Sequence, residues 1–159
     1  MFRFAIVFFA LSVSFAQAEN ALILAQDNSP LRIESYTSRY KKPDRVGDGT
    51  VIHRVGIANT SKDYVSAFGI GFYIFDAFKR DMGRPFVGYS MSGVEVDAID
   101  EAAWEQRPGS AFLFKDYGQG LAYVAIVRME DGTIWRADES EILKQIEDFE
   151  FSLEDNEAE

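Results

Sequence analysis

The chain has 159 residues, no cysteine and a formal net charge of −10 at pH 7. The lack of cysteine excludes disulfides, thiolate nucleophiles and cysteine-ligated zinc. The acidic balance, with no basic stripe, argues against nucleic acid or an anionic membrane surface as a partner.

Residues 1–18 have the pattern of a cleaved export signal. Arg3 supplies the positive charge, residues 4–15 are apolar or small, and Ala16-Gln17-Ala18 gives the small-x-small pattern read by signal peptidase. The apolar run is about a dozen residues, whereas a membrane-spanning helix needs roughly 20. We predict cleavage after Ala18 and a periplasmic or secreted bacterial protein with no membrane span after cleavage. The alternatives are an uncleaved anchor or a buried N-terminal helix.

The rest of the chain consists mainly of β-strand patterns separated by turn residues. Strands are predicted at residues 31–40, 50–58, 65–78, 111–115, 121–130 and 133–137, with short edge strands at 86–89 and 94–96. Residues 97–107 form an irregular acidic segment, and 117–120 form a turn. No βαβ alternation is present, so a parallel sheet is not expected.

The segment 65–78 carries the strongest strand pattern. Period-two spacing predicts a core face made of Phe68, Ile70, Phe72 and Ile74. The opposite face carries Gly69 and Gly71. Two glycines on one face of a strand indicate that another group packs close to the backbone there.

A β-hairpin is predicted around Asp131-Gly132, the pair favoured in two-residue type I′ loops. That register places Met129 opposite Ile134 and Arg128 opposite Trp135. A cation–π contact between Arg128 and the Trp135 indole would then help to hold the hairpin together.

Residues 138–149 change to helical spacing. The apolar positions are Ile142, Leu143, Ile146 and Phe149, and Asp138 with Glu141 has the spacing of a capping box. Such a helix needs an apolar surface, for which the glycine-bearing face of 65–78 or the outer face of the hairpin is available. Residues 150–159 are predicted to be an acidic flexible tail.

These elements predict an all-β fold, an immunoglobulin-like antiparallel β-sandwich with one short C-terminal α-helix. The predicted organisation is a signal peptide at 1–18, a single sandwich domain at 19–149 and the tail at 150–159.

The segment 55–76 pairs a strand, Asn59-Thr60-Ser61 and a second strand that ends Phe72-Tyr73-Ile74-Phe75-Asp76. This pattern resembles the FxLYD-type domains, bacterial extracytoplasmic β-sandwiches that mostly lack an assigned function. Ile74 and Phe75 stand where that pattern has Leu and Tyr. Independently of the resemblance, the Asn59 and Ser61 side chains can bond their own turn, and Asp76 can cap the loop that follows.

His53 is the only histidine and shares a strand face with three aliphatic side chains. That setting is typical of a structural histidine with satisfied hydrogen bonds. A Ser-His-Asp hydrolase would have no other histidine, and the sequence contains no G-x-S-x-G elbow.

Carboxylates gather at Glu95, Asp97, Asp100, Glu101 and Glu105. The ordinary interpretation is a solvated acidic loop. A calcium site needs six to eight oxygen ligands, and a glycosidase needs a pair of carboxyl groups, but neither has its motif here. No metal or cofactor is predicted.

Aromatic side chains lie in or beside several loops. Those favoured as anchors for a partner, or for stacking on a sugar, are Phe86, Tyr89, Trp104 and Phe112, with Phe114 and Tyr117 nearby. They can equally fill the ends of the sandwich.

The leading hypothesis is an exported, non-enzymatic β-sandwich that binds another envelope or secreted protein or serves as an accessory subunit. One alternative is a carbohydrate- or calcium-binding module that uses the acidic segment. The other, ranked last, is an envelope hydrolase that uses His53 or paired carboxylates.

Overall fold

A computed structural model describes residues 21–43, 49–83, 85–107 and 114–154. The predicted signal peptide lies outside these ranges. The elements in chain order are β1 (Ala21–Ile23), β2 (Leu31–Lys41), β3 (Thr50–Asn59), β4 (Val65–Asp76), β5 (Phe86–Ser90), β6 (Ile99–Gln106), a 3₁₀ turn (Phe114–Asp116), β7 (Tyr117–Met129), β8 (Ile134–Arg136) and α1 (Glu139–Glu154). No helix within the described ranges is long and apolar enough to cross a membrane.

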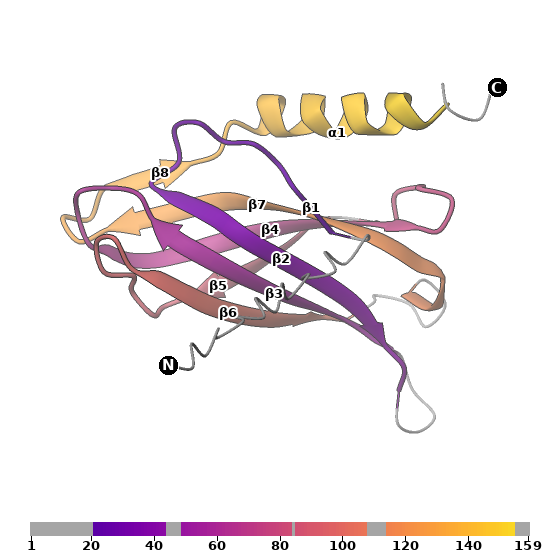
Figure 1. The fold of residues 1–159 in the computed structure, drawn as a ribbon, viewed down its shortest axis with the longest axis horizontal. Helices are drawn as coiled ribbons and strands as arrows, with labels where there is room; N and C mark the ends of the chain where they lie inside the picture. The colour runs from indigo at the N-terminus through magenta and orange to yellow at the C-terminus, as the bar shows by residue number, and fades with distance from the viewer. Residues whose placement is uncertain (1–20, 44–48, 84, 108–113, 155–159) are drawn as a thin grey trace, which may run out of the picture.

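The strands form two sheets that pack face to face (Figure 1). One sheet has the order β5-β4-β7, with β1 and β8 both paired to β7, and the other has the order β2-β3-β6. This is the strand order of an immunoglobulin-like sandwich, with β2-β3-β6 as its A-B-E sheet and β5-β4-β7-β8 as its C′-C-F-G sheet. The predicted fold class is confirmed.

One strand pair departs from the expected antiparallel pattern. β1 runs parallel to β7, and the pairing continues past the strand because the Leu24 N–H donates to the Ala122 carbonyl at 3.0 Å. The chain then crosses to the other sheet as β2. β1 and β7 are therefore connected through all the strands between them and not by a βαβ unit. Its three residues lack any sequence periodicity that could have predicted the pairing.

Several predicted boundaries were wrong. The end of the strand predicted at 111–115 is instead the start of the 3₁₀ turn at Phe114, and residues 111–113 lie outside the described ranges. The acidic segment predicted to be irregular forms β6, paired with β3 along eight residue pairs. β7 begins at Tyr117, where a turn was predicted. The predicted edge strand at 94–96 is reduced to a single bridge between Val65 and Val94. Strand pairing decided these regions, because the gain from joining a sheet depends on neighbours that a single sequence does not reveal.

The core face predicted for β4 is confirmed. Phe68, Ile70, Phe72 and Ile74 are each at most 2% exposed. The Phe72 ring meets four rings from four other strands, with centroid distances of 4.2 Å to His53, 5.7 Å to Tyr36, 5.7 Å to Trp104 and 6.1 Å to Phe86. These rings join the two sheets.

The opposite face of β4 also behaves as predicted, because tyrosine rings lie against its glycines. A Cβ at Gly71 would lie 2.2 Å from the Tyr123 ring of β7, and one at Gly69 would lie 3.1 Å from the Tyr89 ring of β5. The glycines therefore let aromatic rings lie close to the sheet.

The hairpin register was wrong by one residue. Arg128 pairs with Ile134 and Val127 pairs with Trp135. The Met129 N–H donates to the Thr133 carbonyl and the Gly132 N–H donates to the Met129 carbonyl, with Gly132 at φ +88°. This is a three-residue loop with a left-handed glycine rather than a two-residue loop. Successive side chains point to opposite faces, so Arg128 and Trp135 lie on different faces and do not stack.

Helix α1 covers part of the outer face of the larger sheet (Figure 1). Asp138 precedes it and accepts the Ser140 N–H at 2.9 Å, which caps the helix. Ile142 and Ile146 pack on the strands, whereas Leu143 is 49% exposed, contrary to the prediction. The helix continues to Glu154, so the predicted boundary of the tail at 150 was too early, and residues 155–159 lie outside the described ranges.

Gly118 supplies a test of backbone packing. A Cβ there would lie 2.5–2.7 Å from backbone atoms of Asp76 and Ala77, which belong to the paired strand and the turn that follows it. We expect Gly118→Ala to lower the free energy of unfolding by about 2 kcal/mol. Gly71→Ala should lower the free energy of unfolding by less, because its Cβ meets the ring of half-buried Tyr123, which can move. Urea unfolding of both variants measures the order, and equal losses would contradict it.

Candidate functional site

His53 is fully buried and belongs to the core. Its ring stacks on Phe72, its Nδ1 accepts a hydrogen bond from the Tyr36 hydroxyl at 2.9 Å, and its Nε2–H donates to the Gln106 side-chain carbonyl at 3.1 Å. Both nitrogens are thus used by the neutral ring. A general base must reach the proton that it removes, and this ring has no path to a substrate. The geometry gives His53 a structural role.

Burial lowers the pKa of His53 to about 4, and the hydrogen bond to Gln106 opposes that shift only in part. The imidazolium would lose its hydration among aromatic rings, which disfavours the charged form. Burial likewise raises the pKa of Tyr36, so this pair stays neutral at physiological pH.

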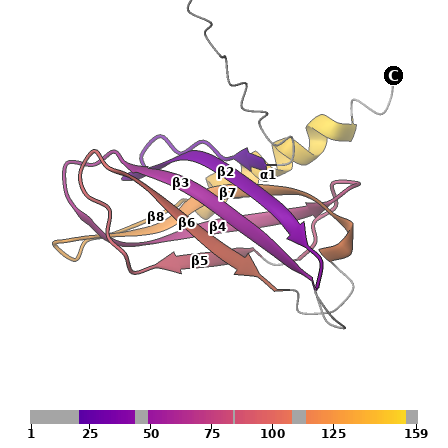
Figure 2. The ribbon, with the colours of Figure 1, turned by 60° about the horizontal axis from the view of Figure 1, so that its bottom comes forward.

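Two of the predicted aromatic anchors hold the edges of the two sheets together. β5 and β6 lie along the same side of the sandwich (Figure 2). The Trp104 indole of β6 points inward, donates to the Tyr89 carbonyl of β5 at 3.1 Å and lies over Gly88. Phe86 packs beside it against the core. Trp104 and Phe86 are half-buried, so most of their surface is used in folding.

Tyr89 is the predicted anchor, among the described residues, whose side chain is mostly exposed to solvent. It is 66% exposed and lies on the outer face of the larger sheet, away from Trp104. Phe112 lies outside the described residues.

The predicted acidic loop is dispersed. Glu95 and Asp97 lie in the connection before β6, whereas Asp100, Glu101 and Glu105 lie on the strand itself. Asp100 and Glu101 are adjacent on a strand, so their side chains point to opposite faces, and the Asp100 carboxylate accepts the Glu101 N–H at 2.8 Å. Among the described residues, no three carboxylate or histidine side chains come close enough together to hold a metal ion.

The outer face of the larger sheet carries a surface that the sequence revealed only in part. Strand pairing places two rows side by side across β5, β4 and β7. The first row is Tyr89, Gly69 and Ile126, and the second is Val87, Gly71 and Tyr123. We call these six residues the tyrosine face. The glycines of β4 form its floor, and rings from the neighbouring strands lie over that floor.

Helix α1 reaches the tyrosine face only at Tyr123. It covers the end of the sheet that includes Phe75 and Leu121, where Tyr73 and Tyr123 also contact its cluster. The Tyr73 and Tyr123 rings are 6.0 Å apart, so they join the covered end to the uncovered one. Burial raises the pKa of Tyr123 to about 12, so its hydroxyl remains a neutral hydrogen-bonding group.

Two arginines flank the tyrosine face. Arg136 of β8 extends the row of Tyr89, Gly69 and Ile126, because it pairs with Ile126. Arg128 lies two residues further along β7 on the same face, and both arginine side chains are exposed. On a chain with a net charge of −10, these arginines place positive charge along the β7–β8 side of the tyrosine face, whereas Glu139 lies near Tyr123 on its helix side.

Sequence reasoning found the glycines of this surface and Tyr89, but it did not find Tyr123 or Ile126. The available signal was the pair of glycines, which required large neighbours. Only the strand order shows which strands supply them.

No family model matches the sequence, and no curated protein matches it. Among solved structures, the fold is similar to the X-ray structure of Northeast Structural Genomics Consortium target SoR45. The TM-score is 0.46 and the identity 15%, covering 71% of this chain and 83% of that one.

Protonation of His53 should make stability depend on pH. Because folding lowers its pKa from 6.5 to about 4, its contribution is complete above pH 6.5 and is lost as the pH falls toward 4. Between pH 7 and pH 4.5 the free energy of unfolding should fall by about 2 kcal/mol because of this one residue. Urea unfolding at several pH values measures it, and His53→Gln should show a correspondingly smaller slope. Equal slopes would show that His53 does not titrate this way.

The different roles of Trp104 and Tyr89 can be separated by stability. Trp104→Ala should cost about 3 kcal/mol, since it removes a ring from the core edge and leaves the Tyr89 carbonyl without its donor. Tyr89→Ala should cost less than about 1 kcal/mol, because the ring is mostly exposed. Thermal unfolding of both variants tests the difference. A larger loss from Tyr89→Ala would reverse the assignment.

Proposed function

We propose that this chain is an exported, non-enzymatic β-sandwich that binds another envelope or secreted protein through the tyrosine face. The proposal depends above all on one observation. Tyr89 is 66% exposed, and Val87, Tyr123 and Ile126 are half-buried, beside a part of the same sheet face that the chain's own helix covers. Tyrosine and arginine are among the residue types that most often dominate the binding energy of protein interfaces.

The partner segment that fits best is an amphipathic helix with an acidic flank. α1 already packs on this sheet through Ile142 and Ile146, which are four residues apart on one helix face. A second helix could pack in the same way on Ile126 and the tyrosine rings. Arg128 and Arg136 would then pair with its carboxylates, and this pairing would favour an acidic segment over a basic one.

A site-specific cross-linking experiment tests the proposal. The photoreactive residue benzoylphenylalanine is placed at position 89 of the full chain in its native host, and the cross-linked peptide is identified by mass spectrometry. We expect one envelope protein, joined through a segment with amphipathic helical spacing and Asp or Glu on its flank. The matched control carries the same residue at position 99 of β6, where Ile99 is 71% exposed, and should not capture that segment.

Charge reversal tests the same interface independently. Arg128→Glu with Arg136→Glu should weaken binding of the captured segment, made as a peptide, by at least about tenfold at low salt, and less at high salt. Arg54→Glu, on the outer face of the other sheet, is the control. Equal capture from positions 89 and 99, no capture at all, or a basic segment would contradict the proposal.

A further inference from the structure

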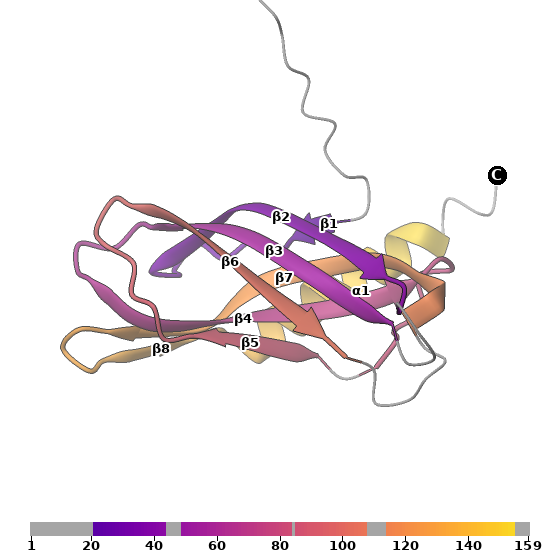
Figure 3. The same ribbon diagram turned by 90° about the horizontal axis from the view of Figure 1, so that it is seen from below.

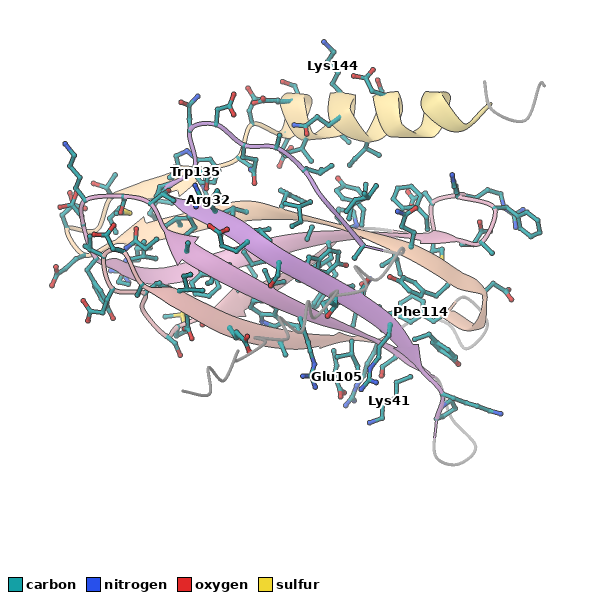
Figure 4. All side chains as sticks on the ribbon, viewed as in Figure 1. Arg32, Lys41, Glu105, Phe114, Trp135 and Lys144 are labelled. Carbon is teal, nitrogen blue, oxygen red and sulfur yellow. The ribbon has the colours of Figure 1, made fainter. Side chains whose placement is uncertain are left out.

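A cleft lies on the side of the sandwich opposite to Trp104. It has a volume of about 730 Å³ and lies between the loop before β2, the turn after β3 and the β7–β8 hairpin. Figure 3 shows the hairpin extending at this end, and Figure 4 shows Trp135 and Arg32 close together there. Its volume is within the range of small-molecule sites, and none of its lining residues belongs to the tyrosine face.

The cleft has an apolar wall. Trp135 and Met129, both half-buried, pack against the main core on one side and line the cleft on the other. Pro30 also lines it. The indole is therefore held in place by folding and still presents part of its surface to a ligand.

The loops around the cleft are fixed by internal hydrogen bonds. The Gln26 side chain bonds both the N–H of Val124, at 2.7 Å, and its carbonyl, at 2.9 Å, as a strand neighbour would. Thr60 bonds the Pro30 carbonyl through its N–H and its hydroxyl, at 3.0 and 3.1 Å. A rim held in this way loses little freedom when a ligand binds.

Three other polar side chains of the rim keep unused hydrogen-bonding capacity. Within the described part of the chain, Asp27 and Asn28 make no side-chain hydrogen bond. Arg32 uses its Nε, at 2.7 Å, and one terminal nitrogen on Glu34, which leaves the other nitrogen free. A carboxylate, an amide and a guanidinium, all solvent-exposed, thus line the same cleft as the indole.

This combination suits a saccharide. The C–H face of a sugar ring is apolar and packs on an indole, while its hydroxyls both donate and accept hydrogen bonds. Asp27 accepts, Arg32 donates and Asn28 does both, so together they match vicinal hydroxyls. The charge of Arg32 is already paired with Glu34, so the cleft does not require an anionic ligand.

We propose that the cleft at Trp135 is a binding site for a neutral saccharide, with Trp135 as the stacking surface and Asp27, Asn28 and Arg32 as its hydroxyl partners. The site is separate from the tyrosine face. The full chain could therefore hold a glycan and a protein at the same time.

Tryptophan fluorescence tests this directly, because the chain has only two tryptophans. Trp104→Phe leaves Trp135 as the sole reporter. The probes are mono- to tetrasaccharides of glucose and of N-acetylglucosamine, which are all neutral, each up to about 10 mM. Cellulose and chitin, in a sedimentation assay, form the polymer arm. We expect a saturable change in Trp135 emission with at least one sugar, or sedimentation with one polymer.

Rim variants then establish where the sugar binds. Asn28→Ala and Arg32→Ala should each weaken binding by about tenfold, and Trp135→Ala should abolish it, while Arg54→Ala leaves it unchanged. If Trp104→Phe or Trp135→Ala does not fold, saturation-transfer NMR of the sugars with wild type, Asn28→Ala and Arg32→Ala gives the same comparison. Absence of any sugar or polymer binding, or binding that the rim variants leave intact, would overturn the proposal. Cross-linking from position 89 should be unaffected by the rim variants, so the two proposals can fail separately.

Discussion

The packing of aromatic rings around Phe72 is the interaction on which the structure depends. Phe72 comes from the middle of β4, and the rings that meet it come from β2, β3, β5 and β6. A chain without cysteine has no covalent link between its sheets, so it must hold them together by packing. The ring cluster explains why the only histidine is buried: His53 acts as one more flat ring, and its nitrogens are satisfied by Tyr36 and Gln106.

The two tryptophans show how one residue type serves different ends in the same frame. Trp104 closes the gap between β5 and β6, and its indole N–H is used by the Tyr89 carbonyl. Trp135 lies on the other side, beside the loop before β2, and lines an open cleft. Folding uses the N–H and most of the surface of the Trp104 indole, whereas the Trp135 indole still presents part of its surface to the cleft. Both proposed sites therefore consist of side chains that core packing leaves partly exposed.

Several features of the fold were predictable because they depend on neighbours in the sequence. The alternation in β4 identified its core face, the Asn59–Ser61 turn forms the expected bonds, and Asp76 caps the following loop through the Phe78 and Arg80 N–H groups. The predicted register of the hairpin was wrong by one residue because Asp131-Gly132 fits a three-residue loop as well as a two-residue one. The acidic strand β6 was not predicted because its strand character comes from pairing with β3 and not from its own composition.

The sequence by itself determined that the chain is acidic and free of cysteine, that it forms a β-sandwich with a C-terminal helix, and that large groups must lie over Gly69 and Gly71. These properties follow from composition and from spacing of a few residues. Only the tertiary structure decided that Tyr89 and Tyr123 are those groups, that Trp104 is structural and that Trp135 borders a cleft. The physical reason is that each of these surfaces is built from strands distant in sequence, whose order and register are set by the packing of the whole core.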